Sequence, residues 1–285
     1  MSSARLLPLT LLPLLAACER TELELQLSAT PRSDLAQVVL SIEAVQLRDA
    51  EGRVERLDVD LEPVDLLRLT PGRRLVLVDG RELEEGRYES LRLVVDADES
   101  YVTRRDGGRL ELTAFDEGDF APLALTLEEG DRATRVVDLE LRFSLADRED
   151  EDGGYAFDPQ LSVIDPETAA SLGGRIPAAQ VESSACRGDR PLTEGLAVYL
   201  FSGREAVPRE RNRAGGPLLS APVLASALGD GYRYRFPLLP PGDYTVALTC
   251  EADEDDPFEA GETLAFEDPV SVTLEAEEEA VEDLD

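Results

Sequence analysis

Cys18 is the residue whose type and surroundings point most directly to a chemical reaction. It ends the segment Leu15-Ala16-Ala17-Cys18, which follows one positive residue, Arg5, and an apolar run over residues 6–17. This layout, with small residues at the cleavage point, is that of a secretory signal peptide. A thiol placed directly after those small residues is what lipid transfer to a bacterial lipoprotein requires. The sequence therefore predicts a cleaved lipoprotein signal over residues 1–17 and lipidation of Cys18.

Two other interpretations of this segment stay open. A retained membrane helix would need roughly 20 apolar residues, whereas this run is shorter and is interrupted by Pro8 and Pro13. The second is an ordinary secretory signal with an incidental cysteine. Glu19 follows the cysteine, at the position where an aspartate retains lipoproteins at the inner membrane of enteric bacteria. We therefore expect a lipid-anchored protein of the cell envelope, at the outer membrane, facing the periplasm or the cell surface.

Cys186 and Cys250 remain once Cys18 is assigned to lipid. An even pair of cysteines in an oxidising compartment favours a disulfide. Closing a loop of this length would stabilise the fold by roughly 4 kcal/mol in the chain-entropy model. The alternative is two separate buried thiols.

The types of basic residue present exclude several kinds of catalytic site. The chain has no histidine, and all 28 of its basic residues are arginine. Catalytic triads, histidine zinc sites and lysine nucleophiles are therefore excluded within this chain. Paired carboxylates could still support hydrolysis, but with so many acids two neighbours are expected by chance. The sequence predicts no catalytic residues and no enzyme, and a carboxylate-based hydrolase is the third alternative for function.

Two acidic clusters could bind calcium, which prefers several hard oxygen ligands on a flexible turn. One spans residues 147–153 and includes Asp150 and Asp152; the other contains Asp253, Asp255 and Asp256. Neither has the spacing of an EF-hand loop, and charge runs are usually solvated loops. We expect no cofactor, with calcium as the alternative and the second cluster as its better site.

The net charge limits the possible partners. The formal charge is 28 − 61 = −33, and such a surface repels nucleic acid and anionic headgroups. Salt lowers the cost of this self-repulsion, so a halophilic origin is expected, although a GC-rich genome also explains the absence of lysine. The expected partners are the membrane, through lipid on Cys18, and an envelope protein or glycan. The chain has no tryptophan and few aromatics, so glycan binding has no direct support.

From residue 21 onward, apolar residues alternate with polar ones, as they do in half-buried strands. Turn signals such as Asp106-Gly107-Gly108 separate these segments. One short helical turn is expected at residues 64–69. Strands are expected at residues 23–27, 38–42, 54–61, 75–78, 88–95, 110–113, 123–127, 136–145 and 155–163, and then at residues 196–201, 232–238, 244–250, 263–266 and 270–274. Many short strands of this kind indicate an all-β fold with two antiparallel β-sandwich domains in tandem.

A shared local pattern supports two sandwiches. Residues 83–88 and residues 239–244 both read Leu-x-x-Gly-x-Tyr and then enter an alternating strand. We expect each tyrosine to start a strand with its ring against the core and its hydroxyl free to bond near the edge.

The order of segments in the first part resembles a family of bacterial lipoproteins, domain of unknown function 4382, over about residues 22–165. The segments that carry the resemblance are residues 38–47, 64–67, 86–95 and 138–143. The second part, through residues 195–201 and 239–250, is similar to carboxypeptidase-regulatory-like or transthyretin-like sandwiches. The resulting domains are the signal (1–17), a first sandwich (18–170), a second sandwich (171–275) and a frayed, solvated acidic tail (276–285).

Neither resemblance implies an activity. The sequence therefore predicts a lipid-anchored envelope protein that serves as a non-catalytic interaction or ligand-binding module. A calcium-dependent or glycan-binding surface sandwich is the alternative.

Overall fold

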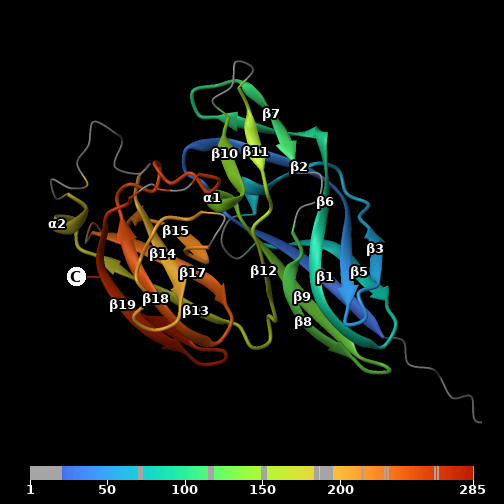
Figure 1. The fold of residues 1–285 in the computed structure, drawn as a ribbon. Coiled ribbons are helices and arrows are strands. Elements are labelled where there is room, and N and C mark those ends of the chain that lie inside the picture. The colour runs from blue at the N-terminus through green and yellow to red at the C-terminus, as the bar shows by residue number, and fades with distance from the viewer. Residues whose placement is uncertain are drawn as a thin grey trace, which may run out of the picture.

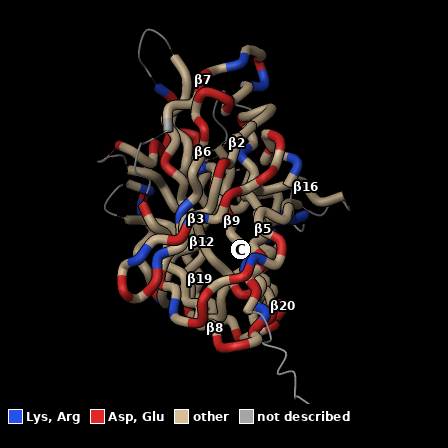
Figure 2. The backbone as a smooth tube through the Cα atoms, turned by 90° about the vertical axis from the view of Figure 1, so that its right-hand side faces the viewer, with Lys and Arg blue, Asp and Glu red and all other residues tan. Residues whose placement is uncertain are grey.

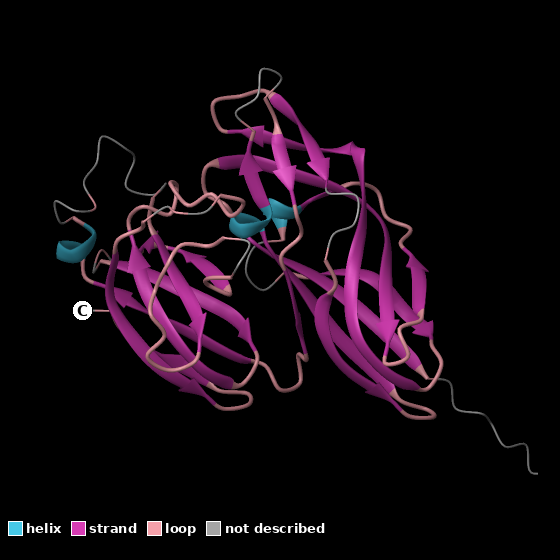
Figure 3. Cartoon of the chain, viewed as in Figure 1, coloured by secondary structure: helices cyan, strands magenta, loops and turns pink. Residues whose placement is uncertain are grey.

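Strands make up most of the chain, as Figure 3 shows for the computed structural model. The structure describes residues 21–69, 73–114, 119–148, 153–182, 186, 195–212, 215–227, 229, 231–259, 261 and 263–284. The strands form two β-sandwiches side by side, with a short helix, α1 (Leu141–Ser144), between them (Figure 1). The predicted all-β sandwich class is confirmed.

The first sandwich is built from residues 22–164. One sheet has the order β12-β9-β1-β5, and the other has the order β10-β11-β7-β6-β2-β3, with β4 beside β2 and β8 beside β6. The strands of the first sheet are β1 (Glu22–Thr30), β5 (Leu75–Glu82), β9 (Arg132–Glu140) and β12 (Leu161–Ile164). Those of the second are β2 (Leu35–Asp49), β3 (Val54–Asp58), β4 (Val64–Asp65), β6 (Gly86–Arg104), β7 (Arg109–Ala114), β8 (Ala121–Leu127), β10 (Leu145–Asp147) and β11 (Tyr155–Phe157).

Strict alternation explains how β1 lies in this core. Leu23, Leu25 and Leu27 have no exposed surface, while the residues between them are partly exposed. Each fully buried leucine contributes about 1.5–3 kcal/mol relative to an exposed one. β1 pairs antiparallel with β5 and parallel with β9. Parallel pairs also join β11 to β7 and β13 (Ala170–Ile176) to β20 (Glu279–Val281), so the sheets are antiparallel in most of their pairs but not in all.

The second sandwich is built from two four-stranded sheets, with orders β16-β17-β13-β20 and β15-β14-β18-β19. Its remaining strands are β14 (Ala197–Ser202), β15 (Leu219–Pro222), β16 (Leu224–Ala225), β17 (Tyr232–Leu239), β18 (Gly242–Thr249) and β19 (Phe266–Leu274). β14 is buried at five consecutive positions. One face packs in the core of this sandwich, and the other face packs in a smaller cluster that contains Phe266 of the second sandwich and Phe143 of α1.

The two tyrosines of the repeated pattern occupy equivalent positions. Tyr88 donates its hydroxyl to the carbonyl oxygen of Glu84 (3.0 Å), and Tyr244 donates its hydroxyl to that of Pro240 (2.8 Å). Both rings are buried. This confirms the predicted role of each tyrosine, which fixes the turn that leads into its strand.

Several helices and strands differ from the sequence expectation. The predicted strand at residues 136–145 is interrupted by α1, and the predicted strand at 155–163 divides into β11 and β12. The expected helical turn is the 3-10 helix η1 (Leu66–Arg68), which Asp65 caps through the backbone N–H of Leu67. A second short helix, α2 (Ala178–Val181), was not expected. None of the helices in the described ranges is long and apolar enough to cross a membrane.

The expectation of a frayed C-terminal tail is wrong. β20 pairs with β13, and the backbone N–H groups of Glu282 and Leu284 donate to the carbonyls of Gly173 and Arg175 (2.8 and 2.9 Å). Leu284 has no exposed surface. Backbone pairing and one buried leucine therefore hold this acidic segment against the sheet.

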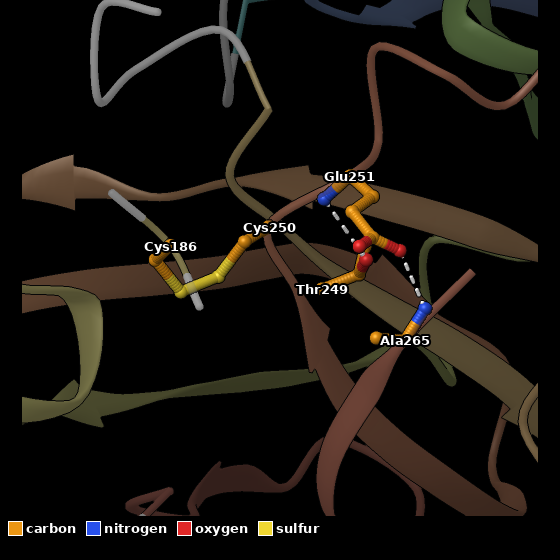
Figure 4. Close-up of a disulfide and its surroundings, with 5 residues drawn as sticks. All are labelled: Cys186, Thr249, Cys250, Glu251 and Ala265. Atoms are coloured by element: carbon orange, nitrogen blue, oxygen red, sulfur yellow. Dashed lines mark hydrogen bonds between the residues drawn. A yellow bond between two sulfur atoms is a disulfide. The ribbon is translucent and has the colours of Figure 1, made fainter. Parts of the chain in front are cut away.

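A disulfide joins Cys186 to Cys250, whose Cα atoms lie 5.0 Å apart (Figure 4). The predicted bridge is confirmed. Cys250 follows β18, and the next residue, Glu251, accepts a hydrogen bond from the backbone N–H of Ala265 (2.6 Å). The bridge thus ties the segment after α2 to the end of a core strand.

Candidate binding site

The outer face of the β16-β17-β13-β20 sheet gathers arginines and exposed apolar side chains. The strand register places Arg233 opposite Arg175, and Arg235 opposite Gly173. In the same rows, Leu224 lies opposite Arg233 and Val281 lies opposite Gly173. We call this set the arginine face: Arg175, Arg233, Arg235, Leu224 and Val281.

A groove of about 800 Å³ runs over this face. Leu224 is 61% exposed and Val281 is 77% exposed, and both line the groove. Gly173 lies between Arg235 and Val281 in its row and lines the groove without a side chain. The volume is in the range of pockets that bind small molecules, about 300–1,000 Å³.

The charges on this face are unusual for the chain. Arg175 and Arg233 lie directly opposite each other on neighbouring strands, an arrangement that destabilises a sheet. Asp283 offsets part of this repulsion, since its carboxylate lies 3.0 Å from the Arg175 guanidinium and also accepts from the Arg175 backbone N–H (2.8 Å). These hydrogen bonds hold the pKa of Asp283 below its usual value. Elsewhere acidic positions outnumber basic ones along both sandwiches (Figure 2).

Two other hollows fit a ligand less well. A cleft between the sandwiches, lined by Asp138, Arg74, Ser220 and Arg235 among others, has a volume of about 70 Å³, which is room for about two water molecules. A hollow of about 590 Å³ over β6 and β8 is lined by Arg87 and residues 122–126 among others. The large apolar side chains of residues 122–126 are buried. The arginine face is therefore the stronger candidate.

A buried carboxylate joins the two sandwiches close to the small cleft. Glu140, at the end of β9, accepts hydrogen bonds from the backbone N–H of Ser220 (2.8 Å), from its hydroxyl (3.0 Å) and from the backbone N–H of Arg142 (3.1 Å). Glu140 is 1% exposed. Burial raises the pKa of Glu140 to about 7, although the donated hydrogen bonds favour its charged form. Both carboxylate oxygens of Glu140 accept hydrogen bonds, two of them from Ser220, so Glu140 links the two sandwiches.

Apolar packing supports this link. Phe143 of α1 packs edge-on against the ring of Tyr199 in β14, with centroids 5.3 Å apart, and belongs to a core cluster otherwise made of second-sandwich residues. The buried Arg142 donates to the carbonyl of Ala252 (2.6 Å). Tyr199 donates its hydroxyl to the carboxylate of Asp255 (2.7 Å). The two sandwiches are therefore joined by buried packing and hydrogen bonds.

The first sandwich contains a region that matches a family model. Residues 20–159 match the family model described as Domain of unknown function (DUF4382). The resemblance inferred from the order of segments is confirmed for this part of the chain, which we call the DUF4382 region. No curated protein matches the chain.

The solved structures found to be similar are distant. A leucine-rich repeat protein from Bacteroides thetaiotaomicron has 10% identity and a TM-score of 0.22; the match covers 93% of this chain but only 26% of that one, so the chain spans about a quarter of its length. The fimbrial anchor protein Mfa2 from Porphyromonas gingivalis has 9% identity and a TM-score of 0.20, covering 82% and 80% of the two chains. An adhesin candidate from Bacteroides ovatus has 9% identity and a TM-score of 0.22, covering 99% of each. These similarities are too distant to carry an inference about function.

Of the residues singled out for calcium, Asp253, Asp255 and Asp256 lie in the described part of the chain, and they do not form a group of metal ligands. Asp255 is buried and accepts from Tyr199 and from the backbone N–H of Arg211 (3.1 Å), whereas Asp253 is exposed. Asp256 accepts from the backbone N–H of Phe258 (2.8 Å). In the parts of the chain described, no three His, Cys, Asp or Glu side chains are placed to hold a metal ion. Calcium binding stays a prediction; Cys18, Asp150 and Asp152 lie outside the described residues.

The arginine face was not predicted from the sequence, although part of its signal is present. In the segment Tyr232-Arg233-Tyr234-Arg235-Phe236, arginines alternate with aromatics, so both arginines must lie on the outer face of a strand whose inner face is core. The missing information was the register that brings Arg175 opposite Arg233. The sequence analysis divides the two domains between residues 170 and 171 and predicts no strand around Arg175, whereas the structure shows strand β13 over Ala170–Ile176.

Proposed function

We propose that the chain is a lipid-anchored protein of the cell envelope that acts by binding a partner, without catalysis, through the arginine face. In this proposal the second sandwich is of the carboxypeptidase-regulatory-like or transthyretin-like kind and carries the binding site. The DUF4382 region lies between this sandwich and the lipid on Cys18. The observation that carries the proposal is the groove over the β16-β17-β13-β20 sheet, where Leu224 and Val281 stand exposed beside three arginines. A groove lined by exposed apolar side chains is typical of an interaction site.

Two observations support the location. The segment Leu15-Ala16-Ala17-Cys18 has the form of a lipoprotein signal. The disulfide between Cys186 and Cys250 is of a kind that persists in oxidising compartments such as the periplasm and the cell surface.

The binding proposal can be tested with a displayed library of random peptides, selected on the purified protein without its signal segment. Enriched peptides should lose binding to a Leu224→Ser/Val281→Ser variant. The matched control is Val54→Ser/Val76→Ser, which changes two valines of the first sandwich that are 50% and 41% exposed. Peptides that bind all three proteins equally, or the absence of any enrichment, would contradict binding at the arginine face.

Anchoring is tested by Cys18→Ser in a bacterial host. The variant should lose labelling by radioactive palmitate and leave the membrane fraction. The double variant Cys186→Ser/Cys250→Ser is the matched control, because it removes thiols without touching the acceptor and should stay labelled. If Cys18→Ser stays in the membrane fraction, the apolar segment itself is the anchor and lipidation is rejected.

A further inference from the structure

We infer that the arginine face binds an extended, acidic segment of a partner protein in which apolar and acidic residues alternate. This inference rests on the proposed function and adds the chemical class of the partner. It follows from the local charge of the groove, from the positions of its apolar side chains and from the spacing of the strands beneath it.

The local charge is opposite in sign to that of the chain. Three arginines and one aspartate line the groove, whereas the whole chain carries 61 acidic residues against 28 arginines. The one aspartate, Asp283, pairs with Arg175 and also feels the charge of Arg233. Arginine presents its donors in a planar fork that fits a carboxylate. A partner with carboxylates at this place would be attracted locally, while a basic partner would be repelled there.

The apolar side chains lie at the two edges of the sheet. Leu224 is on the edge strand β16 and Val281 is on the edge strand β20, with the arginine-bearing strands β17 and β13 between them. From β16 to β20 there are three strand spacings, or about 14 Å, and the rows of Leu224 and Val281 are offset by two residues, about 7 Å, so their Cα atoms lie about 16 Å apart. Four steps of an extended chain cover about 13 Å, and residues i, i+2 and i+4 point to the same side. A segment that crosses the sheet diagonally would therefore bring apolar residues at i and i+4 within side-chain reach of Leu224 and Val281, with an acidic residue at i+2 over the arginines between them.

The same features argue against a sugar. Carbohydrate recognition usually relies on exposed aromatic rings, and Tyr234, the aromatic residue that lines the groove, is only 3% exposed. Its hydroxyl donates to the carbonyl of Glu282 (2.7 Å). The exposed groups are instead guanidinium and aliphatic, which suit acidic and apolar peptide side chains.

The inference can be tested by fluorescence anisotropy with a labelled peptide made of two Val-Thr-Glu-Thr repeats and a final Val. Two further peptides replace Glu by Gln or by Arg, and a labelled sulfated polysaccharide is the fourth probe. The Glu peptide should bind at least tenfold more tightly than the Gln peptide, a difference of about 1.4 kcal/mol. The Arg peptide should not bind. Salt at 1 M should remove most of the preference for Glu, because it shortens the Debye length to about 3 Å.

Substitutions test whether the preference for the Glu peptide comes from the arginine face. Arg233→Gln/Arg235→Gln should bind the Glu peptide as weakly as the Gln peptide. The control Arg87→Gln/Arg132→Gln makes the same change in net charge at two exposed arginines of the DUF4382 region, paired with Glu89 and Glu22, and should keep the preference. Leu224→Ser/Val281→Ser should weaken binding of both the Glu and the Gln peptide.

Three outcomes would overturn the inference. If the Glu and Gln peptides bind equally and both depend on Leu224 and Val281, the partner is not acidic although the proposed binding function stands. If the control pair loses the preference as completely as the groove pair, the attraction is not local to this face. If the polysaccharide binds through the arginines and the Glu peptide does not bind, the partner is an anionic glycan. Failure of the proposed function itself would appear separately, as the absence of groove-dependent peptides in the library selection.

Discussion

Ser220 of the second sandwich donates both its backbone N–H and its hydroxyl to the carboxylate of Glu140 in the first, at 2.8 and 3.0 Å. The two residues are 80 positions apart in the chain, and both are buried. The contact between the sandwiches therefore contains a buried carboxyl group that can titrate.

Glu140→Gln should reduce the pH dependence of stability. Burial raises the pKa of Glu140 from 4.5 to about 7 in the folded protein. The protonated Glu140 therefore adds to the free energy of unfolding in full below pH 4.5, and this stabilisation is lost as the pH rises through 7. Between pH 5 and 8 the free energy of unfolding of the natural protein should fall by about 2–3 kcal/mol more than that of the variant. Urea unfolding at several pH values measures this, with the exposed Glu43→Gln as control; equal pH profiles for the natural protein and Glu140→Gln would reject it.

Tyr199→Phe should lower stability more than Tyr244→Phe does. The Tyr199 hydroxyl donates to the buried carboxylate of Asp255, whereas that of Tyr244 donates to a neutral carbonyl. Hydrogen bonds to charged groups contribute about 1.5–3 kcal/mol, against about 0.5–1.5 kcal/mol for neutral ones. Urea unfolding of the two variants gives the comparison, and an equal loss of unfolding free energy would mean that Asp255 finds another donor.

A substitution of Asp255 can show whether its carboxylate serves the fold or binds calcium. Asp255→Asn should lower the free energy of unfolding by the same amount in millimolar calcium and in EDTA, because the structure uses both oxygens of Asp255 for protein donors. A larger loss in calcium would instead support the calcium prediction, since a bound ion stabilises only the folded state.

A strand with one buried face can be predicted from the sequence, because its apolar and polar residues alternate. The alternation of Leu23, Leu25 and Leu27 predicts β1, because strand periodicity is a local property. The interruption at α1 is different. Residues 141–144 fit a strand by alternation, yet Glu140 caps a helical turn there while its other carboxylate oxygen is bound by Ser220. A contact with a residue 80 positions away decides that local structure, and a local pattern does not contain it.

The arginine face likewise depends on contacts that a local sequence pattern does not contain. Each of Arg175, Arg233 and Arg235 can be placed on the outer face of a strand by alternation, but their gathering depends on the register between β13 and β17. Register is set by turns and by burial over the whole sheet. The C-terminal segment was misjudged for a related reason: its composition is that of a solvated tail, and only pairing with β13 makes it a strand.

Leu284→Ala should destabilise the second sandwich although it lies one residue from the end of the chain. The side chain is fully buried in the core cluster of that sandwich. Truncation of a buried leucine to alanine costs about 2–5 kcal/mol. The control is Val281→Ala, which changes a side chain that is 77% exposed and should alter stability by no more than about 0.5 kcal/mol. Equal urea midpoints for the two variants would show that the C-terminal segment contributes nothing to the core.

Reduction of the bridge between Cys186 and Cys250 should lower stability without changing the fold. The bridge joins residues 64 positions apart and encloses β14 to β18. For a loop of this length the chain-entropy model gives about 4 kcal/mol, because the bond restricts the unfolded chain. The double variant Cys186→Ser/Cys250→Ser should therefore show a lower urea midpoint, with the circular dichroism of a β-protein retained at low urea. A reducing agent should shift the midpoint of the natural protein toward that of the variant and leave the variant unchanged. If the reducing agent shifts both proteins equally, the effect does not come from this bond; if it shifts neither, the bridge does not contribute to stability.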